Sequence, residues 1–382
     1  MMQSSPPHRS LALGFIGGSL RSAVGYAHFI ASTMDNVWAI KAGCFSQCQD
    51  DNLEAGHAYG VAADHIHATW RSLLDREKGR LDAVAVLTPT PTHHNIVVEC
   101  LRQGLPVICE KSLAATSQEA RDIKGNVIAH SGFLAVTYNY SGYPMVRELR
   151  RLIASGVLGR PIHFQAEMPQ EGFIRVDAQG NPPTPQSWRL RDGAIPTIHL
   201  DLASHLHHLI HYLTSERPLK VVADQHTHGW FPTIVDDVSC LCRYSNGLHG
   251  QMWFSKSALG HRNGLRVRLY GSKGSAEWFQ ASPEELLISH IDGRREVMDR
   301  AGIVSIANEQ RYGRFKAGHP AGFIEAFSNL YLDIGYSLRR FQAGEPSDSD
   351  EVFGVDLALE GLVMLEAMAK SVSTGLWTEV SP

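Results

Sequence analysis

"LALGFIGGSLRSAVGYAHFIAST" (residues 11–33) begins with a continuous apolar run, "LALGFI", and passes through a glycine-rich loop into a segment with helical spacing. Similar apolar runs occur at residues 37–45, 82–88 and 106–110, with helical patterns between them. Short apolar runs that alternate with helices indicate a parallel sheet covered on both faces. We therefore predict an α/β fold that starts with a doubly wound Rossmann domain over residues 1–136.

The rhythm changes after residue 136. Strand-like segments follow one another through turns such as "YSNG" and "YGSKG", which favour antiparallel pairing. These segments are residues 161–168, 219–224, 237–244, 248–254, 265–271 and 275–279. They predict an α+β domain over residues 137–382 with a large, mostly antiparallel open sheet. A Pro/Gly-rich stretch at 169–188 is expected to form an active-site wall. Helical patterns close the chain, and the C-terminal helix is expected to pack back on the first domain.

Composition restricts the class of protein. The chain has 382 residues, 43% of them hydrophobic and 19% charged, which suits a soluble globular protein of two domains. The formal net charge is −4 and no block of like charges occurs, which argues against nucleic-acid or membrane partners. No signal peptide or spanning segment is recognisable. The six cysteines form no CxxC pair and are interpreted as free thiols of a cytoplasmic protein.

The glycine loop favours a dinucleotide. Gly17, Gly18 and Gly25 frame the turn from the first strand into the first helix. Glycine lets the backbone approach a pyrophosphate, and a helix N-terminus attracts its charge. An ordinary glycine-rich turn is the alternative. Ser46 stands where such folds usually place an acid for the adenosine ribose. No arginine follows it to bind a 2′-phosphate, although Arg21 in the glycine loop could reach that region. The pattern favours NAD over NADP.

A histidine-rich stretch, "HLDLASHLHHLIHY", occupies residues 199–212. On a helix, Asp201, His205 and His208 fall on one face and leucines supply the apolar side. Helical i, i+4 pairs also bind metals, but no third ligand is identifiable, so we predict no metal. His207 and His211 are expected at the core edge or an interface.

Four segments together resemble the Gfo/Idh/MocA oxidoreductases, the relatives of glucose–fructose oxidoreductase and inositol dehydrogenase. "GGSLRSAVGYAH" (17–28) is similar to the long form of that family's glycine loop, and "TPTPTHH" (88–94) to its TPNxxH loop. "CEKSL" (109–113) stands where the family has EKP, and "WRLRDG" followed by "HLDLASH" resembles its WR and DxxxH segments. The resemblance spans nearly the whole chain.

The resemblance implies a set of site residues. Lys111, Asp201 and His205 would be catalytic, together with Tyr138. A histidine titrates near neutrality and accepts a hydroxyl proton, while a lysine stabilises developing charge on the oxygen. The implied cofactor-binding residues are Gly17, Gly18, Ser19, Leu20, Arg21, Gly25, Ser46, Thr88, Pro89, Thr90, His93, Glu110 and Lys111. The implied substrate-binding residues are Lys111, Tyr138, Tyr140, Trp188, Arg189, His199, Asp201, His205 and His319.

Several of these residues have a structural alternative. Tyr138 and Tyr140, placed after a predicted sixth strand, are candidates for hydrogen-bonded core tyrosines. Arg189 is a candidate for a structural ion pair, His199 for a packed residue, and His319 is the weakest of the group.

The chain also departs from the family pattern. Ser112 replaces the proline of EKP, Leu200 and Ala203 replace glycines, and His199 replaces a small residue. These changes narrow and polarise the pocket floor, which is compatible with an unusual substrate.

Three functions stay open at this point. The first is an NAD-dependent oxidoreductase acting on a hydroxyl of a sugar, sugar derivative or cyclitol. The second, also known in this family, is an NAD-dependent glycosidase that works by oxidation, elimination, water addition and reduction. It requires a second base, and a sulfoquinovoside or another glycoside with an acidic substituent would suit it. The third is a sensor without catalysis, against which the trio Lys111, Asp201 and His205 argues. The resemblance also implies a homodimer or homotetramer.

Overall fold

The computed structural model describes residues 9–347 and 349–381. The chain divides into two compact units, each assembled from separate parts of the sequence. Of the described residues, unit 1 takes 9–114, 118–139, 323–347 and 349–356, and unit 2 takes 115–117, 140–322 and 357–381. A segment close to the C-terminus therefore belongs with the N-terminal part of the chain.

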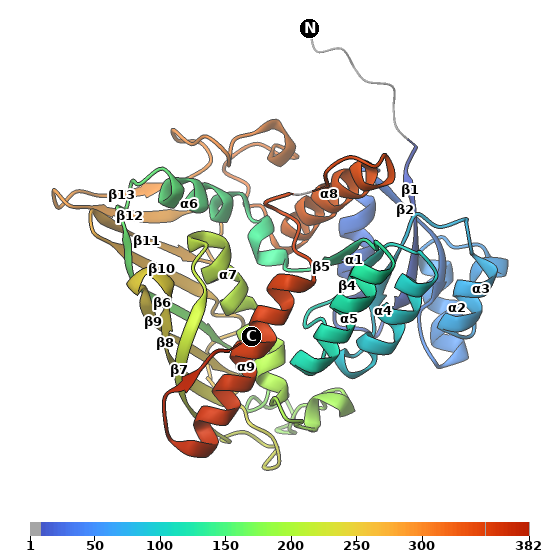
Figure 1. The fold of residues 1–382 in the computed structure, drawn as a ribbon, viewed down its shortest axis with the longest axis horizontal. Helices are drawn as coiled ribbons and strands as arrows, with labels where there is room; N and C mark the ends of the chain where they lie inside the picture. Colours follow the sequence, from blue (N-terminus) through green and yellow to red (C-terminus); the bar gives the residue numbers. More distant parts are fainter. Residues whose placement is uncertain (1–8, 348, 382) are drawn as a thin grey trace, which may run out of the picture. The chain divides into compact units, whose positions relative to one another are not determined.

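Unit 1 is built on a five-stranded sheet whose neighbouring strands are all parallel, in the order β2-β1-β3-β4-β5. The strands are β1 (Leu11–Gly17), β2 (Trp38–Cys44), β3 (Ala83–Leu87), β4 (Val107–Cys109) and β5 (Leu134–Val136). The predicted doubly wound domain is thus confirmed (Figure 1). The predicted sixth strand is wrong for the described residues, because "TYNY" follows β5 directly.

Helices cover this sheet, and one of them comes from far along the chain. The helices are α1 (Gly25–Thr33), α2 (Gln49–Ala58), α3 (Trp70–Arg76), α4 (His93–Arg102), α5 (Ser117–Ala129) and α8 (Phe323–Gln342). Helix α8 packs against α1, and its Phe327 and Tyr331 join the same buried cluster as Phe15 and Trp38. The Trp38 indole also donates a hydrogen bond of 2.9 Å to the Tyr331 carbonyl. Because α8 completes this core, it is the late helix that returns to unit 1.

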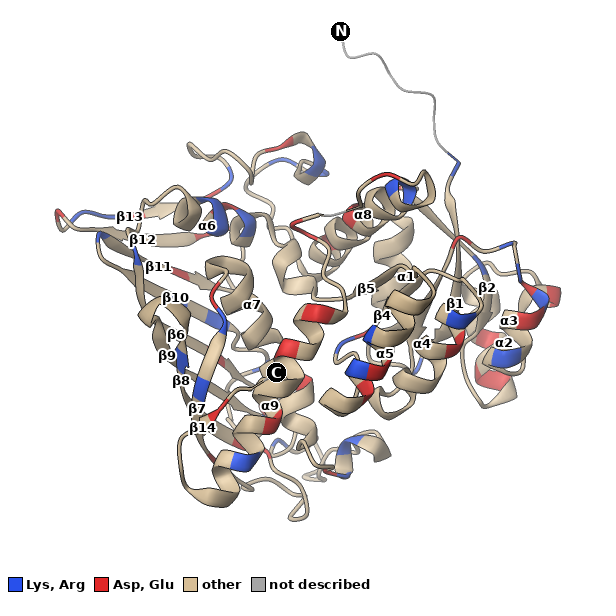
Figure 2. Ribbon diagram, viewed as in Figure 1, with Lys and Arg blue, Asp and Glu red and all other residues tan. Residues whose placement is uncertain are grey.

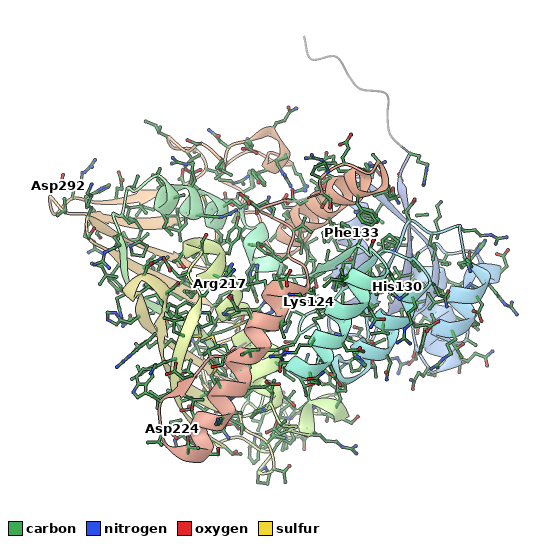
Figure 3. All side chains as sticks on the ribbon, in the orientation of Figure 1. Lys124, His130, Phe133, Arg217, Asp224 and Asp292 are labelled. Carbon is green, nitrogen blue, oxygen red and sulfur yellow. The ribbon has the colours of Figure 1, made fainter. Side chains whose placement is uncertain are left out.

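Unit 2 holds a nine-stranded sheet in the order β13-β12-β11-β10-β6-β9-β8-β7-β14. Among the strands that the structure describes, only the neighbours β6 and β9 run parallel in this sheet, so the predicted mostly antiparallel sheet is confirmed. The strands are β6 (Pro161–Pro169), β7 (Pro218–His226), β8 (Asp237–Tyr244), β9 (His249–Ser255), β10 (Arg266–Gly271), β11 (Gly274–Phe279), β12 (Leu286–His290), β13 (Arg295–Met298) and β14 (Thr378–Glu379). Asp292, labelled in Figure 3, marks the tip of the β12–β13 hairpin, which the sequence patterns missed.

Helices pack on one face of this second sheet. They are α6 (Pro144–Ala154), α7 (Ser204–Thr214) and α9 (Val355–Thr374), of which α9 belongs to unit 2 from Leu357 onward. Ser371 of α9 accepts a hydrogen bond from the Ala223 amide of β7, and Tyr244 of β8 donates one to Met364. Helix α7 continues from a π-helical turn over His199–Ala203. The predicted helix is therefore present, but Asp201 lies in its wider first turn.

Acidic and basic side chains are scattered over the elements of both units (Figure 2), as expected for a sequence without blocks of like charges. Within residues 9–347 and 349–381, no helix combines the length and the apolar character needed to span a bilayer.

Candidate active site

Predicted site residues of unit 1 gather at one edge of its sheet. Gly17 ends β1, Ser46 follows β2, Thr88 follows β3, Glu110 follows β4 and Tyr138 follows β5. Because the strands are parallel, their carboxyl ends meet at the same edge, which is where open α/β sheets bind ligands.

The glycine loop has the geometry that a phosphate group requires. Gly17 and Gly18 have φ angles of +84° and +80°, which side chains rarely tolerate. A Cβ atom on Gly25 would lie 2.2 Å from the Gly18 carbonyl oxygen. The Tyr59 hydroxyl donates a hydrogen bond of 2.9 Å to that same oxygen and fixes the loop from behind. The loop is therefore lined by backbone and leads into the N-terminus of α1, so its residues fit a dinucleotide pyrophosphate.

The residues that follow in the glycine loop make three kinds of contact: a turn hydrogen bond, packing against the core and an ion pair. Ser19 accepts a turn hydrogen bond from the Ser22 amide, and Leu20 packs against the core of unit 1. Arg21 is paired, since its Nε lies 3.0 Å from Oδ1 of Asp51. At the end of β2, the Ser46 hydroxyl accepts from the Cys48 amide at 3.1 Å. The guanidinium that the sequence offered for a 2′-phosphate is thus already engaged by a carboxylate.

His93 braces two loops of this edge. Its Nε2 lies 2.7 Å from the Thr88 carbonyl oxygen and its Nδ1 lies 2.9 Å from the Ser112 carbonyl oxygen. Pro89 and Thr90 form the turn between Thr88 and the start of α4. The His93 ring is 1% exposed, and burial lowers its pKa despite the hydrogen bonds to the two carbonyls. The structure therefore gives His93 a bracing contact with backbone on both sides.

Glu110 is likewise held by buried neighbours. Its Oε1 lies 3.0 Å from His28 Nε2 and accepts a hydrogen bond from the Thr137 hydroxyl, while His28 Nδ1 lies 2.7 Å from the Tyr331 hydroxyl. Burial acts to raise the pKa of Glu110, but His28, Lys111 and Thr137 outweigh it and hold that pKa below its usual range. His28 was not among the predicted site residues.

Lys111 stands between these two anchored positions. Glu110 before it is tied to α1, and Ser112 after it is tied to α4, so the backbone that carries the Lys111 side chain is fixed on both sides. The Lys111–Ser112 peptide bond is cis.

In unit 2, Asp201 is held by two cations. Nη1 of Arg189 lies 2.5 Å from Oδ2 of Asp201, and the Lys256 ammonium donates a hydrogen bond to the same oxygen. The three side chains are 19%, 13% and 9% exposed for Arg189, Asp201 and Lys256 respectively. The ion pair foreseen for Arg189 therefore exists, and its partner is a predicted catalytic residue. Lys256 was missed, because nothing in the sequence links it to a position 55 residues earlier.

His205 packs against an ordered group of polar side chains. Its ring meets Tyr140 edge to face at 4.7 Å between centroids. The Tyr140 hydroxyl accepts a hydrogen bond of 3.1 Å from Asn263, which also donates to Gln280 at 2.7 Å. Gln280 in turn donates to the Tyr143 hydroxyl at 3.1 Å. Tyr140 thus forms one wall of the His205 site and is itself fixed by a hydrogen-bond network.

Of the remaining histidines of this helix, His199, His207 and His208 are buried and His211 is half-buried. His199 is 0% exposed and meets Phe254 edge to face at 5.3 Å, and burial lowers its pKa to about 4. His208 stacks on Tyr212. His207 and His211 lie 3.4 Å and 2.8 Å from the Glu360 carboxylate of α9. In the described part of the chain, no three His, Cys, Asp or Glu side chains are grouped closely enough to hold a metal ion.

Three further predicted site residues are Tyr138, Trp188 and His319. Tyr138 is 3% exposed and packs on Phe353 in unit 1. In unit 2, the Trp188 ring stacks on the Arg189 guanidinium at 4.5 Å, which joins Trp188 to the Asp201 cluster. His319 sits in an exposed loop, where its ring meets that of Phe315 at 4.5 Å.

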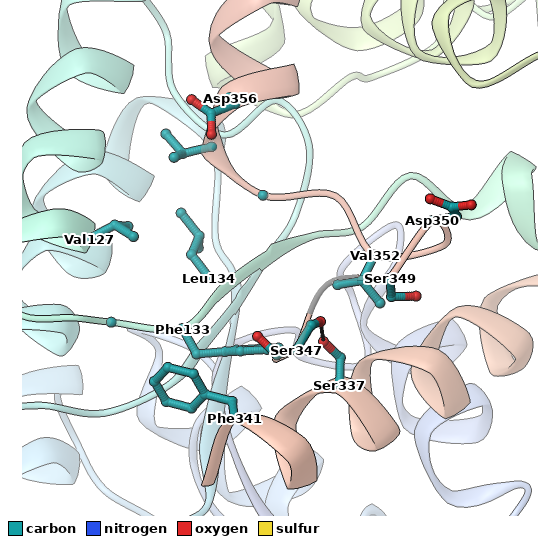
Figure 4. A pocket seen from close by; sticks show the side chains of 13 residues that line it. Val127, Phe133, Leu134, Ser337, Phe341, Ser347, Ser349, Asp350, Val352 and Asp356 are labelled. Atoms are coloured by element: carbon teal, nitrogen blue, oxygen red, sulfur yellow. Dashed lines mark hydrogen bonds between the residues drawn. The ribbon is translucent and has the colours of Figure 1, made fainter. Parts of the chain in front are cut away.

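A cleft of about 660 Å³ in unit 1 lies away from the glycine loop (Figure 4). Phe133 and Leu134, which line it, stand at the amino end of β5, and Phe341 comes from the last turn of α8. This is the opposite edge of the sheet from Gly17 and Thr88, so the cleft is separate from the candidate dinucleotide site.

Two family models match this chain. One, "Oxidoreductase family, NAD-binding Rossmann fold", covers residues 26–138, and the other, "GFO/IDH/MocA C-terminal domain", covers residues 146–277. The chain therefore belongs to the Gfo/Idh/MocA oxidoreductases, and unit 1 carries the family's NAD-binding Rossmann domain.

Individual relatives agree with this assignment. The chain is 29% identical to the uncharacterized oxidoreductase YfiI of Bacillus subtilis, with 97% of both chains covered. It is 26% identical to the levoglucosan dehydrogenase of Pseudarthrobacter phenanthrenivorans over 78% of this chain and 80% of that one. Among solved structures, an inositol dehydrogenase homolog from Azotobacter vinelandii, complexed with NADH and myo-inositol, is similar with a TM-score of 0.86. It is 26% identical, with 97% of this chain and 98% of that chain covered.

Proposed function

We propose that this chain is an NAD-dependent dehydrogenase that oxidises a hydroxyl of a sugar, a sugar derivative or a cyclitol. The observation that carries the proposal is the Asp201–His205 turn, in which the acid is fixed by cations and the histidine by an aromatic wall. The similar chains named above act on, or bind, polyols: levoglucosan in one case and myo-inositol in another. When bound, NAD⁺ supplies the acceptor for the hydride that leaves the substrate carbon.

In unit 1, we assign the cofactor to the carboxyl edge of the sheet. The loop from Gly17 to Gly25 would hold the pyrophosphate and Ser46 the adenosine ribose. The Thr88–Thr90 turn would lie along the nicotinamide ribose. His93 would brace that turn from inside the protein, and Glu110 would fix the backbone directly before Lys111. Lys111 would bind the substrate oxygen and stabilise its developing negative charge.

In unit 2, we assign the proton to His205. A neutral imidazole accepts the hydroxyl proton while the hydride leaves the same carbon. Asp201 would stay an anion throughout. Trp188 and Arg189 would face the sugar, because an aromatic ring suits its apolar face and a guanidinium its oxygens.

The glycosidase alternative is less well supported. It needs a second base for the elimination step, for which tyrosine and histidine are the candidates. Burial raises the pKa of both Tyr138 and Tyr140 well above the ordinary tyrosine value. A raised pKa makes the phenolate more costly to form, so neither residue is favoured as that base.

One assay separates these functions. The purified chain is incubated with NAD⁺ and a panel of myo-inositol, levoglucosan, free sugars, sugar acids and nitrophenyl glycosides, including a sulfoquinovoside. NADH absorbance and nitrophenolate release are followed together. NADH that accumulates without nitrophenolate supports the dehydrogenase, whereas many turnovers of nitrophenolate without NADH refute it in favour of the glycosidase. NADH binding without turnover of any panel member favours the sensor.

The assigned roles predict a specific pattern among variants. Lys111→Met, Asp201→Asn and His205→Asn should each lower kcat by about 10²–10⁴-fold, the usual contribution of a positioned proton-transfer or charge-stabilising group. The dissociation constant of NADH, followed by fluorescence, should change little. Three single variants that all keep wild-type kcat would refute this assignment.

We also propose that the chain self-associates through the open face of the unit 2 sheet. Leu219, Leu241 and Trp377 expose 48%, 50% and 40% of their surfaces there. Light scattering should report a dimer or tetramer, and Leu241→Glu should lower that mass. A monomeric wild-type chain would refute the proposal.

A further inference from the structure

Lys256 occupies a fixed position at the end of β9. Its amide donates a hydrogen bond of 2.7 Å to the Asp236 carbonyl, and its carbonyl accepts one of 2.8 Å from the Phe173 amide. Its ammonium lies 4.9 Å from the centre of the Phe173 ring, an arrangement that further fixes a cation. A lysine held by its backbone and its side chain in this way presents a charge at one defined point.

The Lys256 ammonium is directed at Oδ2 of Asp201. Arg189 binds the same oxygen, so two charge-assisted hydrogen bonds from separate segments of unit 2 meet on one carboxylate atom. Cations within hydrogen-bonding distance favour the ionised form of a carboxylate. Charge-assisted hydrogen bonds are also stronger than hydrogen bonds between neutral groups. Asp201 is thereby held both as an anion and in one orientation.

The two cations on Asp201 determine which of Asp201 and His205 can accept a proton. A carboxylate that receives bonds from two cations is a weak proton acceptor, because protonation would leave both cations without their shared anion. The π-helical turn carries Asp201, and α7 begins at Ser204, directly before His205. Fixing Asp201 therefore also fixes the turn from which His205 projects.

We propose that Lys256 is a positioning residue of the dehydrogenase site, which acts through Asp201 and leaves the proton transfer to His205. The inference rests on the proposed function. It assigns a role to a residue that lies outside the family motifs found in the sequence.

The test is a double-mutant cycle in the full chain. Lys256→Met, Asp201→Asn and the double variant are compared with wild type, using NAD⁺ and the best substrate of the panel. If Lys256 acts through Asp201, Lys256→Met lowers kcat by about 10²-fold, the order expected when a reacting group is misplaced. KM and the NADH dissociation constant should stay within a few-fold of wild type. The double variant should be no slower than Asp201→Asn alone, because residues that act as a unit are not additive.

Two conservative variants and one control complete the design. Lys256→Arg keeps the charge and should recover much of the lost kcat, whereas Lys256→Gln keeps a donor without the charge and should not. Lys220→Met removes a lysine of the same unit whose partner is Glu379, and it should match wild type. If Lys256→Met does not fold, as judged by its melting temperature and NADH binding, the comparison of the Arg and Gln variants decides.

The outcomes separate this inference from the proposed function. An active wild type whose kcat is unchanged in Lys256→Met, or in which the losses of Lys256→Met and Asp201→Asn add, overturns the positioning role alone. Equal kcat values in Lys256→Arg and Lys256→Gln also overturn the positioning role alone. A wild type that reduces no NAD⁺ with any polyol overturns the proposed function itself, and the positioning role with it.

Discussion

The imidazole of His93 lies 2.9 Å from the carbonyl oxygen of Ser112, the residue directly after Lys111. Its other nitrogen meets the Thr88 carbonyl at 2.7 Å. A carbonyl only accepts, and a neutral imidazole has one N–H, so a single hydrogen bond is made at a time. Since burial lowers the pKa of His93, the ring is neutral near pH 7 and donates to one of the two carbonyls while it packs against the other.

His93→Phe should therefore weaken NADH binding. The variant keeps a ring but leaves the Thr88 and Ser112 carbonyls without their donor, a loss of about 1–3 kcal/mol, which corresponds to about 5–150-fold in affinity. Fluorescence titration with NADH measures the change. His94→Phe alters the neighbouring histidine, which pairs with Asp122 at the surface, and serves as the control. Equal affinities in the two variants would show that the brace is unimportant.

Gly25→Ala should damage the dinucleotide site. The new Cβ would lie 2.2 Å from the Gly18 oxygen and 2.7 Å from the Ser19 oxygen, both of them backbone atoms, so the loop must move. Overpacking of this kind costs about 1–3 kcal/mol of stability. The matched control is Gly125→Ala in α5, where nothing lies within 4 Å. That substitution should raise the free energy of unfolding by about 0.5–1 kcal/mol. Urea titration of both variants, with and without NADH, makes the comparison.

Asp51→Ser should shift the cofactor preference towards NADP. The substitution removes the carboxylate that pairs with Arg21 and leaves the guanidinium available to a 2′-phosphate. The ratio of the NADPH and NADH dissociation constants should fall by several-fold. Asp50→Ser changes the preceding acid of the same helical turn and should leave the ratio as it is. If both variants match wild type, Arg21 does not reach the 2′ position.

Mild acid should destabilise unit 2. Burial lowers the pKa of His199 and of His207 from 6.5 to about 4 in the folded chain, so both rings are neutral there while the unfolded chain binds their protons. Their contribution to stability is complete above about pH 6.5 and is lost as the pH falls towards 4. Each can steepen the fall in the free energy of unfolding by up to about 1.4 kcal/mol per pH unit.

Urea titrations at a series of pH values test this expectation. His199→Gln should flatten the slope, whereas His130→Gln, which alters an exposed residue labelled in Figure 3, should not. An unchanged slope in His199→Gln would mean that this ring stays neutral in the unfolded chain or takes up its proton in the folded one.

The sequence was informative where local patterns and spacing set the structure. The run "LALGFI" predicts β1 because a strand buried on both faces must be continuously apolar, and the alternation of "DVSCLCRY" predicts β8 because one of its faces is exposed. The β12–β13 hairpin carried a signal that went unused, the Asp292–Gly293 turn between two short strands.

Other features had no local signal. The contact of Lys256 with Asp201 joins strand β9 to a helical turn far away in sequence, and only the assembled sheet brings them together. The π-helical turn under Asp201 differs from an α-helix by a slight change in winding, which the spacing of apolar residues does not reveal. His28 was read as part of a glycine-loop motif, although its ring turns inward to Glu110.

The return of α8 to unit 1 bears on how the chain is made. A ribosome delivers the whole β-sheet of the Rossmann domain long before it delivers Phe327, Leu330 and Tyr331, which close the core of that domain. Until then the Rossmann domain lacks α8, and Trp38 lacks its partner Tyr331, while strands β6 to β13 of the second sheet are synthesised. Chaperones that shield nascent chains should engage this protein throughout that interval, and a fragment that ends at residue 139 should aggregate when expressed alone.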